Sequence, residues 1–250
     1  MLFVATWDLG LPTTLGQILI AEIVIIAAAT VQGSVGFGAG VVAAPILLLI
    51  HPIFVPGVII GVGFPLTVMV ALRERKHIDK RGATILVLAR ALGTLPAGYV
   101  VGLLASSAYD LIFAGCVLAM VALSAAGVRV RPTTGNLLAT GVFSGFSVTV
   151  SSIGGPPLAM LYQNEPAARV RSTLAVVFAA GTFISLAVLA HFGKFTWDHL
   201  VVSVLLLPGV VSGYLLSNRL TPVINAARLK ASVLVMSASA ALVVLARLLL

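Results

Sequence analysis

Long apolar runs separated by short polar loops make up almost the whole chain. The runs cover residues 17–31, 41–50, 56–72, 83–104 and 111–128, and then 137–150, 156–162, 172–191, 200–216 and 229–249. A helix of about 17 to 25 apolar residues is long enough to cross a bilayer. The pattern therefore predicts an all-α, polytopic membrane protein without a soluble domain.

Glycine-rich breaks interrupt two of these runs. Residues 32–40 read QGSVGFGAG, with four glycines in the last eight positions, and residues 144–157 read SGFSVTVSSIGGPP. Each glycine inside a helix costs about 1 kcal/mol, so a glycine-rich break in an apolar segment requires a reason. Broken apolar segments at matching places in two halves indicate a transport site.

The two halves of the chain repeat at a nearly constant spacing. Gly98 and Tyr99 recur 115 positions later as Gly213 and Tyr214. A shift of 116 places residues 38–39 on residues 154–155, and residues 117, 118 and 120 on residues 233, 234 and 236. We expect a first transmembrane repeat at 1–128 and a second at 129–250.

The distribution of Lys and Arg indicates how the repeats are oriented. If each broken segment crosses the membrane, the chain has eight spans, and its cations other than Arg90 divide nine to five between the two sides. If each broken segment is a re-entrant hairpin, the division becomes twelve to two, with Lys194 and Arg247 on the minority side. Cytoplasmic loops carry an excess of Lys and Arg. This favours two inverted repeats, each with a broken helical hairpin plus three transmembrane helices, with the 73–81 loop in the cytoplasm.

Composition excludes several classes of protein. Charged residues make up 9% of the chain and the mean hydropathy is +1.17, whereas soluble domains are about 25% charged. The net charge of +8 would suggest nucleic acid in a soluble protein, but here the cations lie mostly in loops, so we expect no nucleic-acid partner. The single cysteine, Cys116, excludes an internal disulfide and a multi-cysteine metal site.

The two breaks have the chemistry of an anion site. Non-helical backbone is tolerated at membrane depth where protein or a water-filled cavity covers it. A helix that restarts there presents free N–H groups and a partial positive charge. We expect Ser151 and Ser152 to cap a half-helix that begins near Pro156. The alternative is close helix packing through small residues, which the duplication of the break disfavours. The candidate substrate-binding residues in the breaks are Gln32, Ser34, Gly36, Gly38, Gly40, Ser151, Ser152, Gly154, Gly155 and Gln163.

Two ionisable residues lie inside apolar runs. Arg90 follows the loop residue Arg81 by nine positions, which places it about 13 Å into a bilayer core about 30 Å thick. It is a substrate-binding candidate that would attract an anion, or else an arginine that snorkels or caps carbonyls. Glu22 is a candidate for carrying a coupled proton, or else an interfacial acid near the outer end of the first span.

Catalytic chemistry has little support in the sequence. Most of the acids lie in loops, and the chain contains neither an HExxH nor a GxSxG motif. The histidines are scattered near loops. We therefore expect a protein that is not an enzyme and that has no metal and no cofactor, with an intramembrane enzyme as the weakest alternative.

Several segments together carry a family resemblance. They are residues 36–45 (GFGAGVVAAP), 154–158 (GGPPL) and 171–173 (RST), and the two small-residue spans that end in Gly-Tyr. In this order and duplication the chain resembles the sulfite exporter TauE/SafE family of membrane transporters. The resemblance implies a multi-pass inner-membrane carrier of small anions such as sulfite, sulfonates including sulfoacetate, or related organosulfur and carboxylate anions.

We therefore expect a secondary transporter that exports a small anion by alternating access between its two halves. A passive anion channel is the alternative. The expected partners are the anionic substrate, a coupled proton if Glu22 carries one, and the lipid bilayer. The residues alone leave open which anion is carried, the direction of transport, the coupling ion and the oligomeric state.

Overall fold

The computed structural model describes residues 11–103, 106–125 and 130–221. Within these residues every regular element is helical, as the sequence predicted. The predicted last span, residues 229–249, lies outside them. The elements are α1 (Leu15–Val35), α2 (Ala39–Ile50), η1 (Pro52–Phe54), α3 (Gly57–Arg73), η2 (Arg75–His77), α4 (Lys80–Leu103), α5 (Ser106–Ala125), α6 (Thr134–Ser151), α7 (Gly155–Leu161), α8 (Ala167–His191), α9 (Trp197–Leu205) and α10 (Leu207–Leu220).

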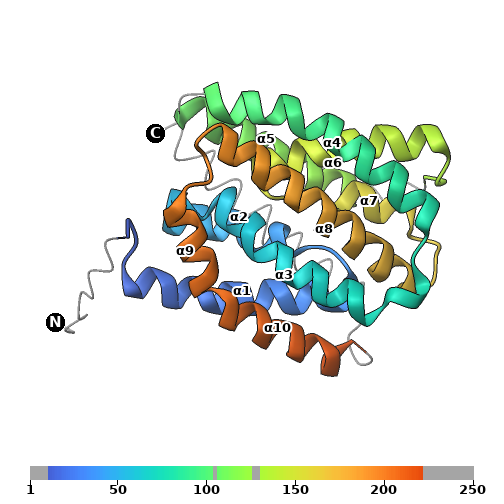
Figure 1. Cartoon of the computed structure of the whole chain (residues 1–250), viewed down its shortest axis with the longest axis horizontal. Coiled ribbons are helices and arrows are strands. Elements are labelled where there is room, and N and C mark those ends of the chain that lie inside the picture. The colour runs from blue at the N-terminus through green and yellow to red at the C-terminus, as the bar shows by residue number, and fades with distance from the viewer. Residues whose placement is uncertain (1–10, 104–105, 126–129, 222–250) are drawn as a thin grey trace.

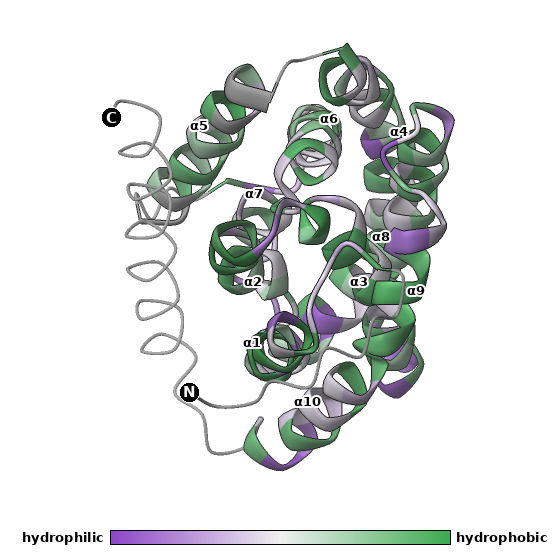
Figure 2. Cartoon of the chain, turned by 90° about the vertical axis from the view of Figure 1, so that its left-hand side faces the viewer, coloured by the Kyte–Doolittle hydropathy of each residue, from purple (hydrophilic) through white to green (hydrophobic). Residues whose placement is uncertain are grey.

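The helices have the length and surface of membrane spans. By length and composition α1, α4 and α8 can each cross a bilayer, and α9 with α10 forms a fourth candidate that is bent by 43°. Large apolar side chains point outward from these helices; Leu88 is 63% exposed and Phe183 is 68% exposed. Apolar residues dominate the outer helices in the end-on view (Figure 2). An outer surface of this kind fits lipid, which confirms the prediction of a multi-pass membrane protein.

The helices lie roughly along one axis, so the bundle has two ends (Figure 1). We call the end where α3 stops and α4 begins the Arg73 end. The opposite end, where α8 stops and α9 begins, is the Lys194 end.

Each broken segment folds back to the end from which it started. In the α1–α2 hairpin, Gln17 Nε2 donates to the Ile50 carbonyl at 3.2 Å, so the start of α1 and the end of α2 lie together at the Lys194 end. The α6–α7 hairpin starts and ends at the Arg73 end, where the Tyr162 hydroxyl donates to Asp79 Oδ2 at 3.0 Å. The hairpins thus enter the bundle from opposite ends.

The helix pairs follow the pattern expected for two halves related by a two-fold axis. Helix α1 packs along α10, α6 packs along α4, and α3 packs along α8. Exchanging the halves turns the first pair into the second and leaves the third unchanged. Helices α2 and α7 lie between α1 and α6, with α3 and α8 along one side of them (Figure 2). The repeat boundary at residues 128 and 129 stays a prediction.

Candidate functional site

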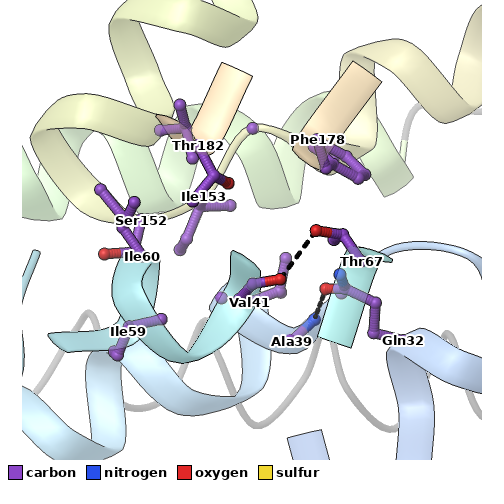
Figure 3. A pocket seen from close by; sticks show the side chains of 16 residues that line it. Gln32, Ala39, Val41, Ile59, Ile60, Thr67, Ser152, Ile153, Phe178 and Thr182 are labelled. Atoms are coloured by element: carbon purple, nitrogen blue, oxygen red, sulfur yellow. Dashed lines mark hydrogen bonds between the residues drawn. The ribbon is translucent and has the colours of Figure 1, made fainter. Parts of the chain in front are cut away.

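The first break lies between α1 and α2. Gly36 ends α1 with φ 97° and Gly38 precedes α2 with φ 110°. Residues other than glycine rarely adopt this left-handed backbone conformation. Gln32 Oε1 accepts a hydrogen bond from the Ala39 N–H at 3.2 Å (Figure 3). The amide oxygen of Gln32 therefore caps α2, and satisfies one of the N–H groups that a helix start leaves unpaired.

The second break lies between α6 and α7, and here the capping prediction was wrong. Ser151 is the last residue of α6, and its hydroxyl donates to the Ser147 carbonyl at 2.8 Å. Ser152 follows in the left-handed conformation with φ 62°, and its hydroxyl donates to the Pro56 carbonyl at 3.1 Å. Gly154 precedes α7, and no side chain caps it. Because α7 begins at Gly155, Gly154 takes the N-cap position, and the two serines lie two and three residues before it.

The two breaks touch each other at glycines. A Cβ added to Gly40 would overlap the Ser152 carbonyl group and would lie 2.8 Å from its carbon. A Cβ added to Gly155 would lie 2.9 Å from the Cβ of Phe37. Real Cβ contacts are longer, so only glycine at positions 40 and 155 lets the two hairpins approach this closely.

A small cavity lies where the breaks meet, with α3 and α8 closing its sides. Its volume is about 50 Å³, which is room for a few waters or one small ion, since a water needs about 10 to 15 Å³ by this measure. Figure 3 shows Ser152 and Ile153 of the second break across from Ala39 and Val41 in the first turn of α2. The lining residues are Gln32, Gly38, Ala39, Gly40, Val41, Ile59, Ile60, Gly63, Thr67, Val148, Ser152, Ile153, Gly154, Gly155, Phe178 and Thr182.

The structure brings most of the sequence candidates in the breaks together at this cavity. The candidates that line it are Gln32, Gly38, Gly40, Ser152, Gly154 and Gly155. Ser34 and Ser151 are buried beside the breaks but are not among the lining residues. Gly36 packs against the backbone of Arg171 instead. Gln163 is exposed in the loop after α7, at the Arg73 end.

Glu22 lies away from the cavity, at the contact between α1 and α10. Its carboxylate packs against Gly209, three residues past the Leu206 bend that separates α9 from α10. A carboxylate is favoured at the start of a helix, where the backbone carries a partial positive charge. The contact with the start of α10 gives Glu22 a structural role. Its role in proton coupling stays a prediction.

Arg90 is fully buried, with an exposed fraction of 0%. Its Nη1 donates to Ser144 Oγ at 2.6 Å, and Ser144 Oγ donates in turn to the Gly154 carbonyl at 2.6 Å. The guanidinium carbon lies 5.2 Å from the centroid of the Phe178 ring. Gly181 on α8 leaves room for the guanidinium, because a Cβ there would overlap Nε. Arg90 therefore sits directly behind two residues that line the cavity, Gly154 and Phe178.

The positive charge of Arg90 is incompletely satisfied. Across the described part of the chain, Nε and Nη2 have no hydrogen-bond partner and no carboxylate lies within ion-pair distance. A buried charge without a partner is unfavourable by several kcal/mol. Such groups in membrane proteins usually mark a substrate or ion pathway.

The sequence did not identify the cavity residues of α3 and α8. Thr67 and Thr182 are buried polar residues within apolar helices. Thr67 is the one threonine of the run 56–72, whereas Thr182 is one of two in the run 172–191, so the residue type alone was a weak signal. Phe178 carried no signal, because an aromatic residue in an apolar run is ordinary.

A comparison with known families matches residues 21–244 to the family model described as Sulfite exporter TauE/SafE. Comparisons with curated proteins and with solved structures gave no match.

Proposed function

The chain belongs to the sulfite exporter TauE/SafE family, and we propose that it is a secondary carrier that binds one small sulfur oxyanion between its two helix breaks. The family is one of membrane transporters of sulfur anions. The proposal adds a site, a mode of binding and a mechanism in which the halves expose that site to one side of the membrane at a time.

The chemistry of the cavity supports an anion as the ligand. The described residues that line it include no Asp and no Glu. Glycines at positions 38, 40, 154 and 155 expose backbone there, so a ligand can contact main-chain N–H groups directly. The start of α2 adds the partial positive charge of a helix amino terminus. A sulfite or sulfonate group, with its charge spread over three oxygens, suits several weak donors arranged around it.

Arg90 is the observation on which the proposal chiefly rests. Arg90 is fully buried and has no carboxylate partner among the described residues, so it supplies a fixed positive potential to whatever occupies the neighbouring cavity. An anion in contact with the far face of Phe178 would lie on the order of 8 Å from the guanidinium. At an effective dielectric constant of about 20, this attraction is worth about 2 kcal/mol, or about thirtyfold in binding.

The test removes the positive charge of Arg90 without leaving a cavity in the core. Arg90→Met keeps most of the side-chain volume, and removing a buried unpaired charge tends to preserve or raise stability. We expect the variant to reach the membrane in normal amounts, to be at least as heat-stable as the wild type, and to bind and transport sulfite about thirtyfold less well. Thermal shift with sulfite and flux in proteoliposomes measure these quantities.

Arg75→Met is the matched control, because Arg75 is exposed in the 73–81 loop and should leave both measurements unchanged. Wild-type flux in Arg90→Met would remove Arg90 from the site. The same proteoliposomes distinguish a carrier from a channel, since a carrier saturates with substrate and a channel gives single-channel currents.

A further inference from the structure

A second cluster of charged residues lies at the Arg73 end, outside the cavity. Glu74 Oε1 accepts a hydrogen bond from Arg171 Nε at 2.9 Å, and it forms ion pairs with Arg171 Nη2 at 2.8 Å and with Arg73 Nε at 3.5 Å. The side chains of Glu74, Arg171 and Arg73 are 14%, 13% and 20% exposed. We call these three residues the Glu74 cluster.

The cluster ties four helices together at one level. Arg73 Nη2 donates to the Gly33 carbonyl near the end of α1 at 2.6 Å, and Nη1 donates to Ser217 Oγ of α10 at 3.4 Å. Arg171 brings in α8, and its Cα would lie 3.0 Å from a Cβ at Gly36 in the first break. Because Glu74 directly follows α3, its bond to Arg171 fastens α3 to α8 beside that break.

The cluster lies on the Arg73 side of the cavity, on the same two helices that close the cavity's sides. On α3, the cavity residue Thr67 precedes Arg73 by six positions, and on α8 Phe178 follows Arg171 by seven. At about 1.5 Å per residue, the cluster lies about 9 to 11 Å from the cavity.

The Lys194 end is more open. A larger cavity of about 430 Å³ lies there, lined by residues that include Pro56, Tyr109 and Lys194. Ser152, which lines the central cavity, bonds the carbonyl of Pro56. Among the described residues, the ion pairs therefore lie at the Arg73 end and the larger cavity lies at the Lys194 end.

The charges of the cluster suit an exchange of ligands. Two arginines face one carboxylate, so the three residues carry a net charge of +1. One Glu74 oxygen lies 2.9 Å and 2.8 Å from two guanidinium nitrogens of Arg171, and arginine contacts other oxyanions, such as a sulfonate, with the same charge-assisted N–H donors. The three side chains are still 13% to 20% exposed, so a soluble anion can reach the arginines and compete with Glu74 for them.

We propose that the Glu74 cluster is a second anion-binding site, at which a small oxyanion replaces Glu74 on Arg171 and Arg73. The exchange releases α3 from α8 and opens the cavity to the Arg73 end. The proposal extends the function proposed above, since the same class of anion would pass both sites. It does not depend on Arg90.

The test measures access to the cavity rather than transport. A cysteine at Thr67, in a Cys116→Ser background, reports labelling by a membrane-impermeant maleimide added to either side of sealed vesicles. We expect Glu74→Gln to raise the labelling rate from the Arg73 side about tenfold. Glu165→Gln is the matched control, because it breaks the ion pair between Arg169 and Glu165, which lies at 3.2 Å within one turn at the same end, and it should change nothing.

Sulfoacetate supplies the second arm, since it does not react with maleimide as sulfite does. It should accelerate labelling from the Arg73 side in the wild-type background and add nothing in Glu74→Gln. The double variant Glu74→Arg with Arg171→Glu exchanges the two charges and should restore slow labelling. This result would show that fast labelling in Glu74→Gln comes from the lost ion pair and not from misfolding.

Equal labelling of Glu74→Gln and Glu165→Gln would overturn the proposal, and so would a wild-type rate that sulfoacetate does not change. If instead the proposed central site is wrong, Arg90→Met will transport sulfite at the wild-type rate, while the labelling results with Glu74→Gln and sulfoacetate will still be as expected.

Discussion

At the scale of single residues, the site depends on glycines, which have no Cβ atom. Gly40 and Gly155 have no Cβ, and the space that a Cβ would take is filled by the opposite break. Gly181 likewise leaves room for the guanidinium of Arg90. Glycine in a membrane helix often serves close packing alone. Here the same contacts also bring backbone to the wall of the cavity.

This contact can be tested by adding one methyl group. Gly40→Ala forces the two breaks apart, and overpacking of this kind destabilises proteins by about 1 to 3 kcal/mol. We expect a lower melting temperature and loss of sulfite binding. Gly115→Ala on α5 is the control, because a Cβ there meets nothing within 4 Å, and alanine in a helix should stabilise by up to about 1 kcal/mol. Equal melting temperatures for the two variants would contradict the close approach.

At the scale of helices, the sequence predicted the two breaks well and their surroundings poorly. Glycine density marked the interruptions at residues 36–38 and 152–154, because glycine disrupts a helix in any environment. The cavity faces of α3 and α8 could not be predicted, since apolar residues surround both helices and neither has a polar face to orient it. The hydrogen bonds of the Ser151 and Ser152 hydroxyls depend on a left-handed turn at Ser152 that the residue types do not predict.

The two broken segments make a further prediction, about sidedness. Thr133 precedes α6 and Gln163 follows α7, and both are exposed at the Arg73 end, whereas Thr196 is exposed at the Lys194 end. Single cysteines at positions 133 and 163 should therefore react with an impermeant reagent from the same side of the membrane, and a cysteine at 196 from the other. An eight-span arrangement would put positions 133 and 163 on opposite sides, and that result would contradict the re-entrant hairpin.

At the scale of the whole molecule, the pairing of α1 with α10 and of α6 with α4 gives the two halves equivalent roles. Each half contributes one hairpin to the centre and packs a helix against the hairpin of the other half. The charged chemistry is not equivalent, because Arg90 lies behind the second break and the Glu74 cluster lies beside the first. An anion passing through would meet a different positive group at each level.

The most direct test of the central site is an experimental density map of the protein with sulfoacetate bound. The account predicts density for the sulfonate group between Gly40 and Gly155, beside Phe178 and within reach of the amides at the start of α2. Uninterrupted helix through residues 36–38 or 152–154, or a sulfonate bound elsewhere while this cavity holds only water, would contradict it.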